Sequence, residues 1–152
     1  MSIDRIRTHT TQDINTMIDY KSEALILEYS DQEFWKISKR IEELDREWDI
    51  ERWLQVNASS LAFTGLTLGT LYKKRWLMLP AIVLPFLMQH AIQGWCPPVT
   101  LFRKMGIRTR REIEREKYAL KVLRGDFDEV RNMDRREAAL NAFRKSSVDR
   151  SS

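Results

Sequence analysis

The segment that decides the fold runs from Trp53 to Phe102 and reads WLQVNASSLAFTGLTLGTLYKKRWLMLPAIVLPFLMQHAIQGWCPPVTLF. These fifty residues contain three charged side chains, whereas the other 102 residues of the chain carry 45. The three are consecutive: Lys73, Lys74 and Arg75. They separate two stretches of 20 residues, 53–72 and 76–95. Because an α-helix rises about 1.5 Å per residue, each stretch is long enough to cross a bilayer core of ~30 Å.

The sequence therefore predicts an all-α protein built on a two-helix transmembrane hairpin. The stretch 76–95 contains eight Leu, Ile, Val or Phe residues, each of which favours insertion by roughly 0.3–0.6 kcal/mol. Aromatic residues mark the ends of both stretches, as in the aromatic belts of membrane helices. They are Trp53, Tyr72, Trp76 and Trp95. The alternative is a soluble bundle with two buried central helices, although a soluble helix rarely runs 20 residues without a charge to face water.

Small residues form a stripe along the first stretch. They are Ala58, Ala62, Gly65 and Gly69, spaced so that they share one helix face. Such a face lets another helix approach closely, and it predicts a helix-packing interface. Basic residues near the two stretches predict the orientation: twelve lie in the flanks 36–52 and 103–117, against three in the loop 73–75. We therefore expect both termini in the cytoplasm.

Four segments follow from this pattern. We expect an acidic N-terminal helical arm over 1–52, the hairpin over 53–102 with its loop at 73–75, a basic C-terminal helical arm over 103–144 and a disordered tail over 145–152. The N-terminal arm has a net charge of −5, and residues 103–152 have +6. Two long amphipathic arms of opposite sign on the same membrane face should pair. Binding of the basic arm to anionic lipid headgroups is a second possibility, and nothing in the chain resembles a nucleic-acid-binding motif.

Two helix starts are predicted by capping boxes, in which a hydroxyl and a carboxylate three residues apart bond the free amides. One joins Ser30 and Glu33, and the other joins Thr109 and Glu112. After the first, five apolar residues at heptad-like spacing predict a cytoplasmic helix interface suited to coiled-coil contact. They are Phe34, Ile37, Ile41, Leu44 and Trp48. This helix is expected to continue into the first span as one long helix.

The segment after the second stretch carries the least generic motif of the chain. Its distinctive residues are Gly94, Cys96, Pro97, Met105, Gly106, Ile107 and Thr109, preceded upstream by Glu51, Arg52, Gly65 and Gly69. Here the sequence resembles the YgaP-like transmembrane domain family over about residues 49–109. The resemblance implies a two-helix unit of a bacterial inner (cytoplasmic) membrane, in a family without an established function. Some relatives are fused to a rhodanese; this chain shows no such domain, so persulfide chemistry does not transfer.

Few residues point to chemistry. Cys96 lies near Arg103 and Lys104, which could lower a thiol pKa and make it reactive. An antiparallel hairpin would also place polar side chains at a similar depth, as a polar pocket or as hydrogen bonds across the hairpin. They are Asn57, Gln89, His90 and Gln93. The single cysteine excludes an internal disulfide, and two histidines far apart predict no metal site; no cofactor is expected.

The sequence thus favours a membrane-anchored helical adaptor or scaffold without catalysis of its own, which associates with itself or with a partner membrane protein in the lipid bilayer. The alternative is a thiol-dependent sulfur-handling or small-solute membrane protein that uses Cys96 and a polar pocket around His90. A wholly soluble helical interaction domain is the third possibility.

Overall fold

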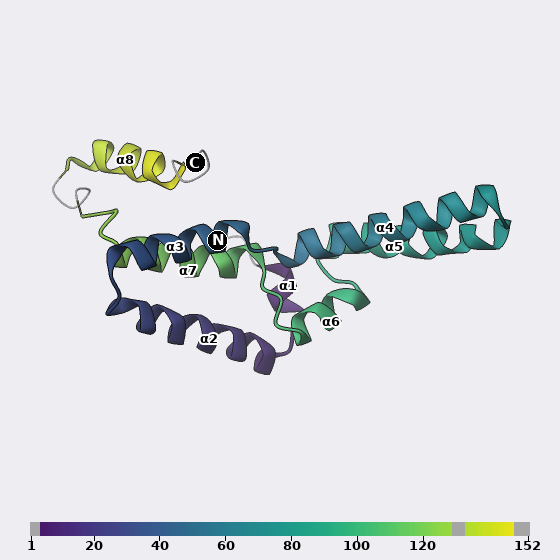
Figure 1. Cartoon of the computed structure of the whole chain (residues 1–152), viewed down its shortest axis with the longest axis horizontal. Helices are drawn as coiled ribbons and strands as arrows, with labels where there is room; N and C mark the ends of the chain where they lie inside the picture. The colour runs from purple at the N-terminus through teal and green to yellow at the C-terminus, as the bar shows by residue number, and fades with distance from the viewer. Residues whose placement is uncertain (1–3, 129–132, 148–152) are drawn as a thin grey trace. The chain divides into compact units, whose positions relative to one another are not determined.

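The computed structural model describes residues 4–128 and 133–147, and the regular structure within these ranges is entirely helical (Figure 1). The all-α prediction is confirmed. The helices are α1 (Arg5–Thr8), α2 (Gln12–Ser30), α3 (Phe34–Arg46), α4 (Ile50–Leu71), the 3-10 turn η1 (Lys74–Leu77), α5 (Met78–Gln93), α6 (Pro97–Lys104), α7 (Arg110–Leu123) and α8 (Arg135–Ser147). The predicted disordered tail began at residue 145; α8 extends to Ser147, and 148–152 lie outside the described residues.

The chain divides into two compact units, and each combines parts of both predicted arms. Unit 1 comprises residues 1–22 and 47–113, and unit 2 comprises residues 23–46 and 114–152. The unit boundaries fall within α2 and α7, so they differ from the expected boundaries at the ends of the hairpin. The reason is that segments on both sides of the hairpin pack against its base within unit 1.

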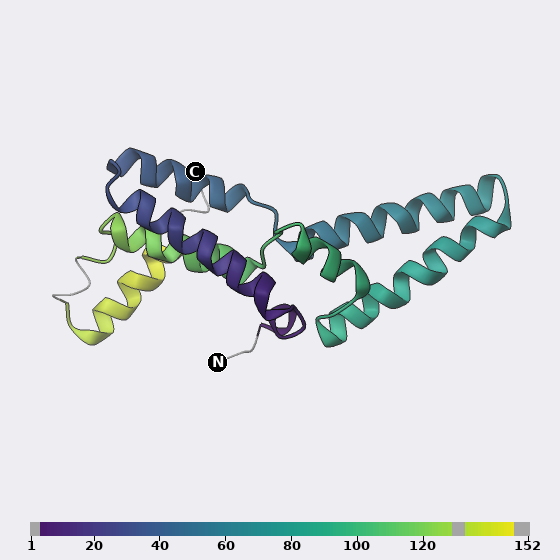
Figure 2. The same cartoon turned by 90° about the horizontal axis from the view of Figure 1, so that it is seen from below.

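Helices α4 and α5 of unit 1 run antiparallel and side by side, joined by η1 (Figures 1 and 2). The carboxylate of Asp49 caps α4 by accepting a 2.8 Å hydrogen bond from the amide of Arg52. Gly94 ends α5 with a φ of 73°, a left-handed conformation that suits glycine. Directly after it, Pro97 starts α6 at a position where no amide proton is needed.

The prediction of one long helix running from the N-terminal arm into the hairpin is wrong. Helix α3 ends at Arg46, and α4 begins at Ile50. Between them the amide of Ile50 donates a 3.0 Å bond to the carbonyl of Arg108, and the Arg108 side chain forms an ion pair with Glu47. These contacts with the chain beyond α6, together with the Asp49 cap, replace the helical bonds that a continuous helix would make.

One capping box is wrong and the other is confirmed. Ser30 is the last residue of α2, where its hydroxyl donates to the carbonyl of Leu27, so it cannot cap α3. Thr109 and Glu112, in contrast, bond each other reciprocally at the start of α7. The Thr109 amide donates to Glu112 Oε2 at 2.8 Å, and the Glu112 amide donates to Thr109 Oγ1 at 3.4 Å.

The apolar core of unit 1 sits at the base of the hairpin rather than between its tips. Its buried members come from α1, α4, α6 and the turn before α6, and three partly buried side chains pack against them. The buried members are Ile6, Ile50, Leu54, Cys96 and Val99, and the others are Leu87, Phe102 and Ile107. The fold therefore joins the N-terminal turn of the chain to both helices of the hairpin.

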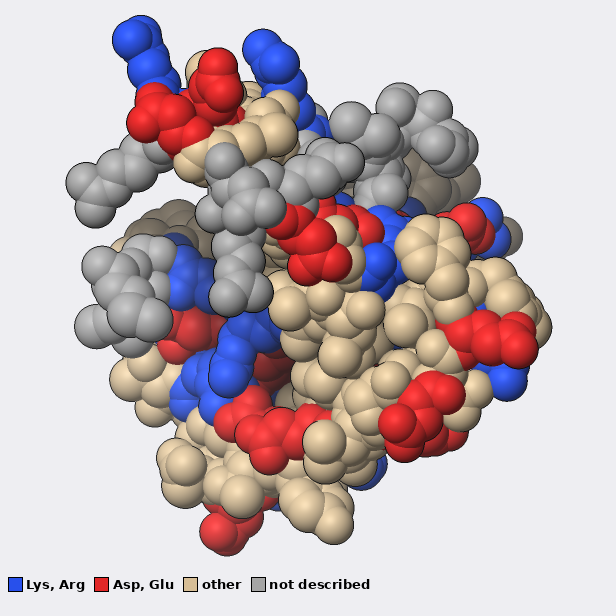
Figure 3. All heavy atoms as spheres, turned by 90° about the vertical axis from the view of Figure 1, so that its left-hand side faces the viewer, with Lys and Arg blue, Asp and Glu red and all other residues tan. Residues whose placement is uncertain are grey.

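Unit 2 is held by buried apolar residues and by ion pairs between α3 and α7. Arg40 pairs with the buried Glu116 at 2.9 Å, and Lys117 pairs with Asp45 at 2.5 Å. In unit 1, Arg108 and Glu47 form a similar pair between the two predicted arms. The predicted pairing of the arms is thus confirmed. On the face seen in Figure 3, basic and acidic side chains lie next to one another in mixed groups, and uncharged surface surrounds these groups.

One helical segment, Lys74–Gln93, is long and apolar enough to cross a membrane, and no residue of its apolar window is buried within the chain. This segment overlaps the predicted second span, 76–95, and begins two residues earlier, within the predicted loop. Helix α4 is long enough to cross a membrane but not apolar enough, because polar residues occupy its first half. The structure thus supports one candidate span, inside a hairpin of two helices.

Candidate functional site

The small-residue face of α4 lies against α5 and η1 of the same chain. Ala58, Gly65 and Gly69 are buried, and Ala62 is half-buried. A Cβ atom at Gly65 would lie 2.4 Å from Cδ of Pro80, and one at Gly69 would lie 2.5 Å from Cδ2 of Leu77. The close approach predicted for this face is present, and the partners are η1 and α5, the second half of the same hairpin. A second molecule therefore finds this face already covered.

A buried ion pair connects α6 to α7 in unit 1. The Arg103 guanidinium is fully buried and donates to both oxygens of Glu112, at 2.6 and 2.8 Å. Arg103 also donates to the side-chain oxygen of Asn15 at 2.8 Å and to the carbonyl of Ile107 at 3.2 Å. The planar guanidinium thus fixes three segments of unit 1, a role for which its five donors are suited.

The network continues to the first turn of the chain. Arg7 donates to Glu112 at 2.5 Å and to both oxygens of Asp19, at 2.9 and 2.7 Å. The hydroxyl of Thr109 donates to Asp4, whose other oxygen caps α1. The hydrogen bonds that Arg7 donates to Asp19 are the main cause of a raised pKa at Arg7. Glu112 is therefore shared by two arginines, and it sits at the centre of the network.

Opposing effects set the ionisation of Glu112. Burial is the largest of them and by itself would raise the pKa of the carboxyl. The hydrogen bonds that Glu112 accepts from Arg103, the Thr109 amide and Arg7 together outweigh the effect of burial, so the pKa of Glu112 lies below its ordinary value. Glu112 is consequently a structural anion, and not a group poised to exchange protons near neutral pH.

Cys96 is a packed core residue. Its side chain is only 1% exposed and lies in the apolar cluster with Ile6, Leu54 and Val99. Burial raises the pKa of the thiol, which makes the reactive thiolate scarcer at neutral pH. The expectation that Arg103 lowers this pKa is wrong, because the Arg103 guanidinium is bound to Glu112 and Asn15.

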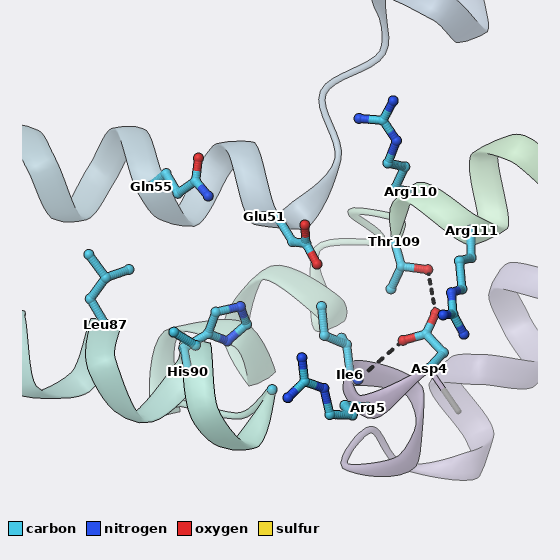
Figure 4. Close-up of a pocket in the computed structure, with 12 residues that line it drawn as sticks. Asp4, Arg5, Ile6, Glu51, Gln55, Leu87, His90, Thr109, Arg110 and Arg111 are labelled. Carbon is cyan, nitrogen blue, oxygen red and sulfur yellow. Dashed lines mark hydrogen bonds between the residues drawn. The ribbon is translucent and has the colours of Figure 1, made fainter. Parts of the chain in front are cut away.

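A pocket of about 410 Å³ lies at the base of the hairpin, between α1, α4, α5 and α7 (Figure 4). Its charged lining comes from both sides of the hairpin, and its apolar lining comes mainly from α5. The charged residues are Asp4, Arg5, Glu51, Arg110 and Arg111, and the others are Ile6, Gln55, Leu87, His90, Ala91, Gly94 and Thr109. Arg5 is held across the pocket edge by a 2.8 Å bond from Nη1 to the carbonyl of Ile92.

Of the four residues predicted to form a polar pocket, only His90 lines this one. Its Nδ1 atom is buried and has no hydrogen-bond partner in the part of the chain that the structure describes. Asn57 is exposed and donates to the carbonyl of Trp53 in its own helix, while Gln89 donates to Gln93 at 3.4 Å. These amides find partners within their own helices, so neither the predicted cluster nor bonding across the hairpin is seen for them.

The segment after α5 has a structural explanation at Gly94, Cys96, Pro97 and Gly106. A Cβ atom at Gly94 would lie 2.5 Å from Cβ of Arg5, so glycine permits both the turn and the approach of α1. Pro97 starts α6, and Gly106 has a φ of 83° in the turn that follows α6. Together with the buried Cys96, these residues shape the path from α5 to α7.

The face predicted as a cytoplasmic interface is largely internal. Ile37, Ile41 and Leu44 are buried, and Phe34 is 66% exposed at the start of α3. Trp48 lies beyond α3, where its ring is 5.2 Å from that of Trp53. The apolar spacing thus identified the side of α3 that packs within its own unit. Of the five predicted interface residues, Phe34 and Trp48 remain exposed.

Two parts of the site were not predicted from the sequence. The ionic network of Arg103 and Glu112 was missed, although Thr109 and Glu112 were recognised as a cap. The charged side of the pocket was missed as well, because Arg5 and Arg111 are brought together only by the fold. The buried network could have been suspected from Arg103 itself, because this arginine lies on the same side of the amphipathic helix α6 as the buried Val99.

Comparisons with protein-family models, with curated proteins and with solved structures found no match to this chain. Among the residues that the structure describes, no group of three or more His, Cys, Asp or Glu side chains is arranged to hold a metal ion. The function has therefore to be argued from the hairpin and from the surroundings of its base.

Proposed function

We propose that the protein is a membrane-anchored helical adaptor or scaffold, which associates with itself or with a partner membrane protein. The observation that carries the proposal is the exposure of α5. No residue in the apolar window of the segment Lys74–Gln93 is buried within the described chain, and only the side of α5 that faces α4 and the hairpin base is half-buried. A soluble core helix of this composition would be mostly buried, whereas lipid solvates such a surface.

The outer side of α4 supports the same proposal. Phe63, Leu66 and Leu71 are 72%, 54% and 73% exposed, although the opposite face of the helix is packed against α5. Both segments are helical, so most of their backbone groups bond within the helix, as hydrocarbon requires. The polar side chains of Thr67 and Thr70 likewise donate to carbonyls of their own helix. The hairpin can therefore enter a bilayer as a unit with its small-residue seam inside.

The association surface is proposed to lie on unit 2. Phe34 and Trp35 are 66% and 58% exposed at the start of α3, and large exposed aromatic side chains are typical of contact sites. The charged surface around them is balanced by ion pairs such as that of Arg40 and Glu116. Recognition would accordingly depend on aromatic contact more than on net charge.

The proposed setting is a bacterial inner membrane with both termini in the cytoplasm, and the proposed role includes no catalysis. The thiol-dependent alternative has lost support, because Cys96 is buried and its thiol pKa is raised. In addition, Asn57, Gln89 and Gln93, which were predicted to form a polar pocket with His90, do not line the pocket that contains His90.

Chemical cross-linking in intact membranes tests the proposed role. A lysine-reactive reagent is expected to yield species larger than the 18.1 kDa chain, and Trp35→Ser should reduce them several-fold. The matched control is Tyr20→Ser, which removes an exposed aromatic side chain from α2 in unit 1. A chain that yields only monomer, both by cross-linking and by light scattering in detergent, would contradict an adaptor role.

A further inference from the structure

The pocket at the base of the hairpin combines a charged rim with an apolar wall, a combination that suits an amphiphile. We propose that it binds the phosphate headgroup of an anionic phospholipid of the surrounding bilayer. The inference rests on the proposed function, because it requires the hairpin to stand in lipid. It goes further in assigning a ligand class to residues that no part of the adaptor role uses.

The position of the pocket matches the headgroup level. Trp53 and Trp95 lie at the same end of the hairpin, and tryptophan is enriched at the membrane–water interface. Glu51 and Gly94 line the pocket beside this level, while Leu87 lies seven residues before Gly94, or ~10 Å deeper along α5. The pocket thus extends from the interface towards the acyl region.

The charge of the rim favours an anion. Three arginines, Arg5, Arg110 and Arg111, and two carboxylates, Asp4 and Glu51, line the pocket. Arg110 also lies 4.0 Å from the carboxylate of Asp49, outside the lining. Asp4 is committed to the fold, because one of its oxygens caps α1 and the other accepts a 2.9 Å bond from the Thr109 hydroxyl (Figure 4). Guanidinium groups bind phosphate oxygens in a bidentate manner, and each basic residue near an anionic membrane surface contributes roughly a fivefold gain in binding.

A polar atom without a protein partner lies at the inner side of the rim. His90 Nδ1 is buried in the wall of the pocket and bonds no atom of the described residues. The ring projects from α5 towards α1 and the arginine side of the pocket (Figure 4). A glycerol or headgroup hydroxyl next to the phosphate could satisfy this nitrogen, whereas an acyl chain alone could not.

The test uses the full chain purified in a mild detergent and native mass spectrometry with added phosphatidylglycerol or phosphatidylcholine. We expect retained phosphatidylglycerol at lipid concentrations that leave no phosphatidylcholine bound. The double variant Arg110→Gln, Arg111→Gln should lower this retention by more than about fivefold. The control Lys104→Gln removes one positive charge from an exposed position outside the pocket and should leave the retention unchanged.

A variant of opposite sign separates binding from folding. Glu51→Gln removes a carboxylate from the rim and should raise retention of the anionic lipid, which a merely damaged fold would not do. Equal retention by the double arginine variant and by Lys104→Gln would overturn the inference. So would displacement of the lipid by soluble glycerol phosphate at a similar concentration, since the pocket would then bind free phosphate.

The outcome can be told apart from failure of the proposed function. A chain that stays in carbonate-washed membranes but shows no preference for phosphatidylglycerol overturns this inference alone. A chain that carbonate releases overturns the proposed anchor itself, and with it the headgroup assignment.

Discussion

Arg103 and Glu112 form a two-bond ion pair with both side chains buried, Nη1 to Oε2 at 2.6 Å and Nη2 to Oε1 at 2.8 Å. The two residues lie on different helices, α6 and α7, on either side of the turn that contains Gly106. Because each charge is taken out of water, the pair is stable only while both partners are present. The base of the hairpin therefore depends on an ionic network as much as on its apolar core.

Glu112→Gln is expected to destabilise unit 1 by about 3–5 kcal/mol, since it leaves the Arg103 charge buried without its anion. Thermal unfolding in detergent, followed by circular dichroism, measures the change. Replacing both residues together, as Arg103→Leu with Glu112→Leu, should cost less than the sum of the single changes. Glu42→Gln, at an exposed position of α3, is the control. A similar loss of stability there would show that the buried pair contributes no more to the free energy of unfolding than an exposed carboxylate does.

The stability of unit 1 should fall in acid. The folded-state pKa of Glu112 lies below its ordinary value of 4.5, so its contribution is complete at neutral pH. That contribution begins to be lost as the pH falls below about 4.5 and is gone below the lowered folded-state pKa. Denaturant titrations at several pH values measure this slope, and Glu112→Gln should flatten it. A slope that persists unchanged in the variant would assign the acid sensitivity to other carboxyls.

Gly65→Leu should push the two helices of the hairpin apart, because even a Cβ atom at this position would lie 2.4 Å from the ring of Pro80. Overpacking of this kind costs about 1–3 kcal/mol. Protease digestion in detergent would detect the opened hairpin as faster cleavage near the loop 73–75. Thr64→Leu places the same side chain on the exposed side of α4 and should leave the cleavage rate unchanged; equal effects of the two substitutions would refute the packed seam.

Cys96 should react slowly with a maleimide in the folded chain and at an ordinary rate after unfolding in detergent and urea. Burial limits access to the sulfur, and the raised pKa reduces the thiolate fraction. Thr11→Cys in a Cys96→Ser background supplies an exposed reference thiol. If Cys96 reacts as fast as this reference at neutral pH, the thiol-dependent function regains its basis.

Local signals in the sequence predicted the elements well. The loss of charge from Trp53 onwards indicated a helical pair divided by the basic tripeptide, and Gly94 and Pro97 marked the end of one helix and the start of the next. The cap at Thr109 was also found, since a capping box is a contact between residues three positions apart. Such features depend on neighbours in the chain and can be recognised without the fold.

Contacts between distant segments could not be predicted in the same way. The break at residues 47–49 depends on Arg108, which lies some sixty positions further along the chain. The network around Glu112 likewise requires Arg7 from the first turn. Charge patterns indicated that the arms would pair, but they could not identify the partners, because many combinations of arginine and carboxylate are consistent with the same composition.

The central claim is that the exposed apolar hairpin is solvated by lipid, and extraction of membranes tests it most directly. Membranes from cells that express the chain are washed with high salt, then with alkaline carbonate, and finally treated with a mild detergent. The account predicts release by detergent alone, and a shift towards the soluble fraction for Leu84→Arg, which places a charge costing about 2.5–3.5 kcal/mol near the middle of α5. Release of the unaltered chain by salt or carbonate would contradict the account, because the apolar face would then have to be covered by protein.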